Sequence, residues 1–217
     1  MFRNREDAAR QLAARLKAGK FRDPLVLAIP RGGVVTGAVL ARELGAELDV
    51  VLARKLRAPQ QPELAIGAIG EDGEVYLNAF AREIPGVTDA YIEKERRHQV
   101  GEIERRRALF RAARASAPVA GRSVIVTDDG IATGSTMLAA LHVLAAQKAH
   151  EIIVAVPVAP PDTLELLRKR CDRVECLLTP SRFGAISVFY YDFTQVEDDE
   201  ALKLLREFRR APKPGAP

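Results

Sequence analysis

Short apolar runs alternate along the chain with longer stretches in which apolar residues recur every three or four positions. An uninterrupted apolar run is typical of a strand buried on both faces, and the longer spacing is typical of an amphipathic helix. The runs predict strands over 24–30, 47–54, 122–128, 151–159 and 173–178. The helical spacing predicts helices over 5–18, 34–44, 135–147, 161–169 and 198–210. This alternation predicts an α/β fold with a mostly parallel five-stranded sheet flanked by helices.

Two segments depart from the alternation. Residues 63–70 and 74–78 flank Glu71-Asp72-Gly73, which predicts a hairpin with a glycine turn. The polar segment 88–115 predicts one long helix with Thr88 as its N-cap. A chain of 217 residues that is 47% hydrophobic is long enough for a sizeable core, so we expect a single domain over 1–217.

Several protein classes are disfavoured by the composition. No stretch approaches the roughly 18 consecutive apolar residues of a membrane span, and the charged N-terminus lacks the apolar centre of a signal peptide. Cys171 and Cys176 are too few for a disulfide framework or a zinc site. We therefore expect a cytoplasmic protein without a membrane partner.

The net charge of +4 is concentrated in one helix. The segment 93–114 holds eight Lys and Arg against four Glu, and this difference of four equals the net charge of the whole chain. We interpret the segment as a solvated helix face with Glu–Arg pairs at helical spacing. An anion-binding or nucleic-acid-binding face is the alternative. Few aromatic residues lie nearby to stack on bases, which disfavours nucleic acid.

The stretch "VIVTDDGIATGST" (124–136) carries the most informative chemistry. An apolar strand ends in Asp128 and Asp129 and is followed by a loop of small and hydroxyl residues that leads into a helix. Free backbone N–H groups at such a helix start form a phosphate cradle, and the missing lysine excludes a Walker A loop. A plain strand-to-helix turn with Asp caps is the alternative. The cradle residues are Ala132, Thr133, Gly134, Ser135 and Thr136.

The acid pair indicates what else the ligand carries. Carboxylates would repel a bare phosphate, so Asp128 and Asp129 must face another part of the ligand. Vicinal sugar hydroxyls donate hydrogen bonds to carboxylates. The pattern therefore favours a ribose 5-phosphate.

With these features, "VIVTDDGIATGST" resembles the phosphoribosyl pyrophosphate (PRPP) binding motif of type I phosphoribosyltransferases. Residues 25–45 resemble the family's first strand and its pyrophosphate loop, in which Gly32 and Gly33 turn N–H groups toward pyrophosphate and Arg31 neutralises charge. The resemblance also implies that a basic residue after the second strand, Lys55 or Arg54, meets the pyrophosphate. A solvated strand-end lysine is the alternative for Lys55.

The resemblance covers a core over 24–160, between an N-terminal helix (1–20) and a C-terminal hood and helix (179–210). The hairpin 63–78 falls where the family has its mobile flap. The helix 88–115 is an insertion or an extended connection to which we assign no chemistry.

The implied reaction is transfer of ribose 5-phosphate from PRPP to a nitrogenous acceptor, with release of pyrophosphate and with Mg²⁺ as cofactor. The implied catalytic residues are Asp128, Asp129, Arg31 and Lys55, and the two acids would reach the metal indirectly, through ribose or water. A PRPP-binding regulator without turnover, linked to nucleic acid by the basic helix, is the alternative function. A sugar-phosphate phosphohydrolase is less favoured, because no two-metal cluster or in-line nucleophile is visible.

Two departures from the family pattern concern the acceptor. Ala132 stands where 6-oxopurine enzymes have a carboxylate, so hypoxanthine or guanine is disfavoured. Gly130 stands where many members have an apolar residue that packs on the base. The acceptor site is therefore reshaped, and Gly130 and Phe183 of the hood are the candidates for contact with a nucleobase or related heterocycle. A place in the core is the alternative for Phe183, and the sequence leaves the identity of the heterocycle open. We also expect a homo-oligomer, with a dimer as the favoured form.

Overall fold

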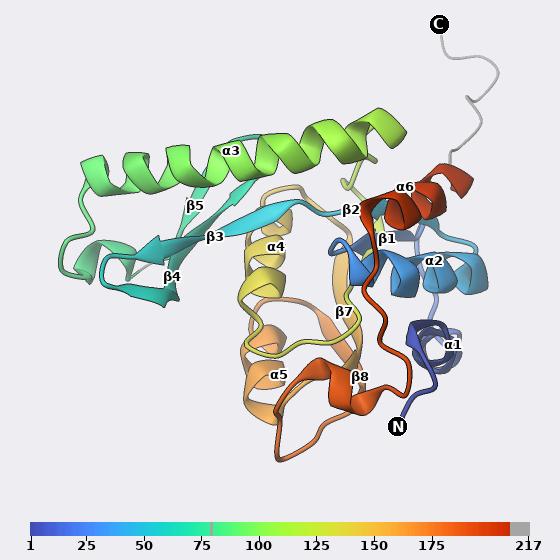
Figure 1. Ribbon diagram of the computed structural model, residues 1–217. Helices are drawn as coiled ribbons and strands as arrows, with labels where there is room; N and C mark the ends of the chain where they lie inside the picture. Colours follow the sequence, from blue (N-terminus) through green and yellow to red (C-terminus); the bar gives the residue numbers. More distant parts are fainter. Residues whose placement is uncertain (79, 209–217) are drawn as a thin grey trace, which may run out of the picture.

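The computed structural model describes residues 1–78 and 80–208, and its centre is a five-stranded parallel sheet (Figure 1). The strand order is β2-β1-β6-β7-β8, and every neighbouring pair is parallel. This arrangement confirms the predicted fold class. The strands are β1 (Leu25–Ala28), β2 (Glu47–Val50), β6 (Ser123–Thr127), β7 (Glu151–Val158) and β8 (Arg173–Leu178).

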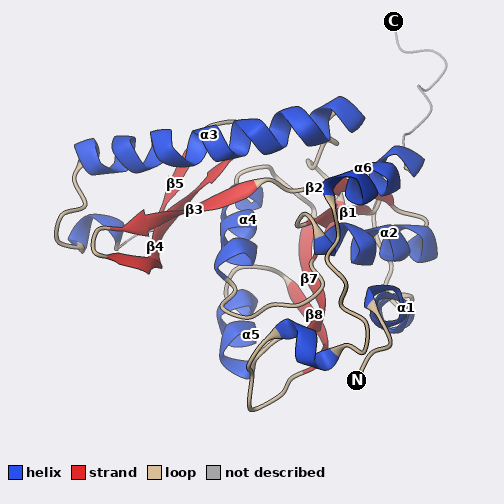
Figure 2. Ribbon diagram, viewed as in Figure 1, coloured by secondary structure: helices blue, strands red, loops and turns tan. Residues whose placement is uncertain are grey.

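Helices cover both faces of this sheet (Figure 2). Alternate strand residues point to opposite faces, so Val26, Ile125 and Ile153 join the core under one set of helices, and Val126 and Val154 join the core under the other. The first set is α1 (Arg5–Leu16), α2 (Gly32–Leu44) and α6 (Asp198–Glu207). The second set is α4 (Ser135–Ala145) and α5 (Pro161–Arg168). Residues 209 and 210, which we also predicted to be helical, lie outside the described residues.

A second, antiparallel sheet corrects part of the strand prediction. It contains β3 (Ala53–Ala58), β4 (Gln61–Gly70) and β5 (Val75–Leu77) in that order. The single strand predicted over 47–54 is wrong, because β2 ends at Val50 and β3 starts three residues later. From Arg54 onward, the strand contains partly exposed polar residues, and Leu56 between them is buried. This pattern is typical of a strand with one solvent-facing side and not of a parallel strand buried on both faces. The predicted hairpin is present as β4 and β5, and β3 pairs with it.

The long helix α3 (Asp89–Ala113) lies across this small sheet (Figure 1). The Thr88 hydroxyl accepts a hydrogen bond from Tyr91 N at 3.2 Å, as expected for an N-cap. Ile103 of α3 packs with Leu56, Ile66 and Ile69 from the sheet. Because α4 packs on β3 and β4 as well, the small sheet is held between α4 and α3. Two short 3-10 turns, Ala81–Glu83 and Ile186–Phe189, complete the described elements.

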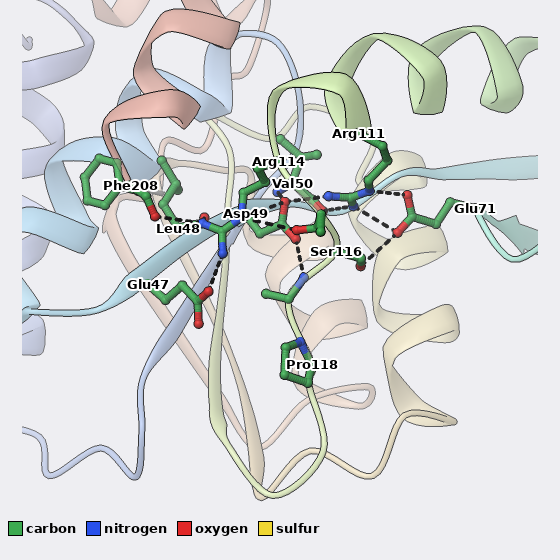
Figure 3. Close-up of polar contacts among 12 residues, drawn as sticks. Glu47, Leu48, Asp49, Val50, Glu71, Arg111, Arg114, Ser116, Pro118 and Phe208 are labelled. Atoms are coloured by element: carbon green, nitrogen blue, oxygen red, sulfur yellow. Dashed lines mark hydrogen bonds and ion pairs between the residues drawn. The ribbon is translucent and has the colours of Figure 1, made fainter. Parts of the chain in front are cut away.

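A buried ionic network fixes the C-terminal end of α3 to the central sheet (Figure 3). Arg111 donates to Asp49 at 2.7 Å and to both carboxylate oxygens of Glu71 at 2.9 Å. Arg114 bonds to Glu47 and to the Leu48 carbonyl. The side chain of Asp49 is only 1% exposed, so its charge depends on these partners. Through Glu71, the same network holds the turn of the predicted hairpin.

None of the helices in the described part of the chain combines the length and the apolar character that crossing a membrane requires. The 25-residue α3 is long enough, but it is rich in charged residues.

The ionic network yields a stability prediction. Arg111→Met keeps much of the side-chain volume but leaves the buried Asp49 carboxylate without its closest cation, so we expect the free energy of unfolding to fall by about 3 kcal/mol. Urea denaturation measures this change. Arg105→Met is the matched control on the same helix, because the Arg105 side chain is 72% exposed and its pair with Glu102 is worth less than about 1 kcal/mol. A loss for Arg111→Met no larger than that of the control would contradict the prediction.

Candidate functional site

A cavity of about 570 Å³ opens where β1, β2 and β6 end. In parallel α/β sheets, ligands bind at this carboxyl edge of the strands. The floor comes from the core, with Ile29 and Pro30 after β1 and Asp128 after β6. One wall comes from the start of α4, and β3 and α3 form the opposite side. Segments that are distant in the sequence thus surround one space.

The predicted phosphate cradle forms the α4 wall. Thr133, Ser135 and Thr136 line the cavity, and the first turn of α4 leaves its N–H groups without helical partners. Gly134 has φ +75°, and a Cβ there would lie 2.7 Å from Cγ2 of Thr163, so only glycine fits. Thr163 Oγ1 also donates to the Ala132 carbonyl at 3.0 Å, which fixes the loop.

The two acids that end β6 have different surroundings. Asp128 lines the cavity, whereas the Asp129 carboxylate accepts a hydrogen bond from Arg5 Nε at 2.7 Å. The backbone carbonyl of Asp129 accepts from the Tyr190 hydroxyl at 2.6 Å. The guanidinium of Arg5 lies 3.8 Å from the ring centre of Phe193. We had expected both acids to face the ribose, and the geometry leaves only Asp128 on the cavity side.

These contacts affect the titration of the neighbouring groups. Burial raises the pKa of the Asp128 carboxyl well above its ordinary value, and the adjacent Asp129 charge raises it further. Burial, again followed by the Asp129 charge, raises the pKa of the Tyr190 phenol, which therefore stays a hydrogen-bond donor. The sequence carried no motif that would have identified Arg5 or Tyr190 as neighbours of the acid pair.

The predicted pyrophosphate loop packs directly on the acids. A Cβ at Gly32 would lie 2.0 Å from Oδ2 of Asp129, and one at Gly33 would lie 3.0 Å from Cα of Asp128. Both positions therefore require glycine. The peptide bond between Pro30 and Arg31 is cis, and α2 begins at Gly32.

The side chain of Arg31 does not line the cavity. Its Nη1 lies 3.3 Å from Glu197 Oε2 and 3.8 Å from Asp198 Oδ1, at the start of α6. This ion pair is partly exposed and therefore weak.

The cavity gains most of its basic side chains from β3 and α3. Lys55, which we predicted, lines it together with Arg54 and Arg57. The residues of α3 on this wall are His98, Gln99, Ile103 and Arg106. We had assigned α3 no chemistry. The sequence did contain a signal for this wall. Gln99, Ile103 and Arg106 are four and three residues apart, which places them on one face of the helix.

The two acceptor candidates lie apart from this cavity. Gly130 is buried, and a Cβ there would lie 2.6 Å from Cγ2 of Ile186. The ring of Phe183 lies 5.4 Å from that of Phe189. Packing against the C-terminal segment thus accounts for glycine at position 130.

A divalent cation is compatible with the cavity only together with a ligand. Within residues 1–78 and 80–208, no group of three His, Cys, Asp or Glu side chains is arranged to hold a metal. Mg²⁺ is usually held by one or two carboxylates together with substrate phosphates and water. Asp128 is the carboxylate in the cavity that fits this mode.

Burial of Asp128 generates a second stability prediction. The folded carboxyl binds a proton more readily than the unfolded one, so the stability of the wild type falls as the pH rises from the ordinary pKa of Asp through the raised one. Asp128→Asn does not titrate and retains an oxygen that can accept from Asp129 N. Near neutral pH we expect the variant to be more stable than the wild type by at least about 0.5 kcal/mol, beyond the usual range of surface substitutions.

Thermal denaturation of both proteins from acidic to neutral pH measures this difference. The advantage of the variant should grow as the pH rises. A constant or shrinking difference would contradict the assignment of a raised pKa to Asp128.

Comparisons with known proteins agree with this geometry. The family model described as "Phosphoribosyl transferase domain" matches residues 2–194. A Mycobacterium tuberculosis protein, whose own assignment as a phosphoribosyl transferase is provisional, is 42% identical over 210 residues, which are 97% of this chain and 47% of the relative. The chain thus spans about half the length of the curated relatives it matches.

One solved structure gives the same result for the fold. The crystal structure of TT1426 from Thermus thermophilus matches with a TM-score of 0.92 and 41% identity, covering 95% of this chain and 98% of that one. A purine phosphoribosyltransferase from Pyrococcus horikoshii is far more distant, with a TM-score of 0.46 and 16% identity over 88% and 90% of the two chains. On the match of the family model and the relative from M. tuberculosis, the chain belongs to the phosphoribosyl transferase domain family.

Proposed function

We propose that the protein is a phosphoribosyltransferase that moves ribose 5-phosphate from PRPP to a nitrogenous acceptor and releases pyrophosphate. The observation that carries this proposal is the shared cavity, in which the phosphate cradle and the Asp128 carboxylate meet Pro30, the residue that enters the glycine loop. A ligand with a phosphate, vicinal hydroxyls and a diphosphate matches these three features in order. The acceptor is proposed only as a class, a nucleobase or related heterocycle.

Each part of the cavity has a role in this proposal. The N–H groups and hydroxyls at Thr133, Ser135 and Thr136 bind the 5-phosphate. Asp128 accepts hydrogen bonds from the ribose. The backbone at Gly32 and Gly33, with the nearby Lys55, binds the diphosphate. Asp129 acts indirectly, because its bond to Arg5 holds the loop that carries Asp128.

The chemistry that follows is mostly positioning and electrostatics. Positive charge develops at the anomeric carbon as the diphosphate leaves, and Asp128, in its ionised form, stabilises that charge. Mg²⁺, when bound beside Asp128, supplies charge that neutralises the departing diphosphate. The side of the cavity that β3 and α3 form limits the access of water, which would otherwise hydrolyse PRPP.

A PRPP-binding regulator that contacts nucleic acid through α3 receives less support. Arg106 lines the cavity, and Arg111 and Arg114 bond inside the protein, so these cations are not offered to an outside polyanion. The expected dimer and the cytoplasmic location stay predictions.

The first test is isothermal titration calorimetry with PRPP and Mg²⁺. We expect the wild type to bind and Asp128→Asn to bind about ten- to hundredfold more weakly, because each hydrogen bond to a charged group contributes about 1.5–3 kcal/mol. Asp199→Asn is the matched control, since Asp199 is an exposed acid in the first turn of α6. If the wild type does not bind PRPP, the proposal is wrong.

Turnover is tested separately, by pyrophosphate release from PRPP in the presence of nucleobases and related heterocycles. Release that depends on one acceptor and is lost in Asp128→Asn supports the transferase. PRPP binding without release for any acceptor would favour the regulator instead.

A further inference from the structure

We propose that helix α3 forms part of the diphosphate subsite, and that its Arg106 binds the diphosphate group of PRPP beside Arg54 of β3, one of the two basic residues already expected there. The inference rests on the proposed function. It adds a residue from outside the PRPP-binding motif and gives a chemical role to a segment that the sequence left without one.

The position of Arg106 supports this role. Its Nη1 lies 3.5 Å from the carbonyl oxygen of Pro30, at the long limit of a hydrogen bond, and Pro30 is the residue that enters the glycine loop. Arg106, Arg54 and Asp128 line the same cavity as the phosphate cradle. The guanidinium is therefore beside the loop proposed for the diphosphate.

The charges around Arg54 and Arg106 also favour a bound anion. Among the residues that the structure describes, neither Arg54 nor Arg106 forms an ion pair, whereas Arg57, Arg111 and Arg114 all do. A partly buried cation that forms no ion pair is costly. Burial, followed by the nearby charge of Arg54, lowers the pKa of Arg106, and the charge of Asp198 offsets this lowering only in part. A bound polyanion supplies the missing negative charge. Guanidinium groups suit this task, because their planar fork makes paired hydrogen bonds to phosphate oxygens.

Arg31 of the glycine loop does not supply a cation to the cavity. We had assigned Arg31 to the pyrophosphate, but its side chain pairs with Glu197 and does not line the cavity. The loop therefore offers backbone N–H groups, and the cationic side chains come from β3 and α3.

The orientation of Arg54 is set by a chain of hydrogen bonds from α3. Gln99 Oε1 accepts from Arg54 Nε at 3.2 Å, and Gln99 Nε2 donates to Glu95 at 3.0 Å. Glu95 in turn accepts from Arg57 Nε at 2.7 Å. Because Gln99 is neutral, this chain orients Arg54 without neutralising it. With the Arg111 anchor further along α3, both arginines are preorganised before a ligand binds.

The test compares three ligands on the full chain. Inorganic pyrophosphate with Mg²⁺, ribose 5-phosphate and PRPP with Mg²⁺ are titrated by calorimetry into the wild type, Arg106→Met, Arg54→Met and Arg105→Met. Arg105 is the neighbouring exposed control, paired with Glu102 at 2.7 Å. Thermal denaturation of each variant checks that it is folded.

We expect Arg106→Met and Arg54→Met to bind pyrophosphate and PRPP about ten- to hundredfold more weakly and to bind ribose 5-phosphate as the wild type does. Arg105→Met should match the wild type with all three ligands. Arg106→Lys should recover part of the lost pyrophosphate affinity, because it keeps the charge but not the planar fork.

The outcomes separate this inference from the proposed function. If Arg106→Met weakens all three ligands equally, or changes none, the role of Arg106 in diphosphate binding is overturned while PRPP binding by the wild type still stands. If the wild type binds pyrophosphate through Arg106 but binds neither ribose 5-phosphate nor PRPP, the anion subsite is supported and the transferase proposal fails.

Discussion

The ion pair between Arg5 and Asp129 connects four parts of the chain that are distant in the sequence. Arg5 opens α1, Asp129 follows β6, and the same guanidinium donates to the Thr194 carbonyl at 2.7 Å. Gly32 lies so close that a Cβ there would be 2.0 Å from the Asp129 carboxylate. Both Arg5 and Asp129 are more than nine-tenths buried, so loss of either leaves an uncompensated charge inside the protein. The shape of the loop that presents Asp128 therefore depends on the two ends of the chain as much as on the motif.

A second ionic network positions the other half of the site. Asp49 and Glu71 hold Arg111, and Glu95 holds Arg57, so α3 is fixed to the core and to the small sheet at different points along its length (Figure 3). Most exposed ion pairs contribute little, but these involve buried carboxylates that need a fixed partner. A helix that is anchored in this way can present a side chain to a ligand with little loss of entropy on binding. This anchoring explains how α3 forms a fixed wall of the cavity.

The sequence was informative about the parts of the molecule that local chemistry determines. Apolar runs located all five strands of the central sheet, and Gly32, Gly33 and Gly134 of the two predicted binding loops stand where a Cβ would crowd its neighbours. It failed at the end of β2, because the apolar run through Ala53 hides the point at which the chain leaves one sheet for another. It also could not separate the roles of Asp128 and Asp129, since two adjacent acids look equivalent until Arg5 is brought to one of them. A contact such as Arg5–Asp129, between residues more than one hundred positions apart in the chain, leaves no pattern in the local sequence.

The packing around Gly130 connects the acceptor question to the rest of the site. Ile186 fills the space beside Gly130, because a Cβ added at position 130 would lie 2.6 Å from Cγ2 of Ile186. Ile186 belongs to the short turn that precedes Tyr190, whose hydroxyl bonds to the Asp129 carbonyl. Thr194, in the same segment, is bonded to Arg5. The segment that packs on Gly130 is thus the same one that bonds to Asp129 and Arg5, so its position and the position of the loop that carries Asp128 depend on the same contacts.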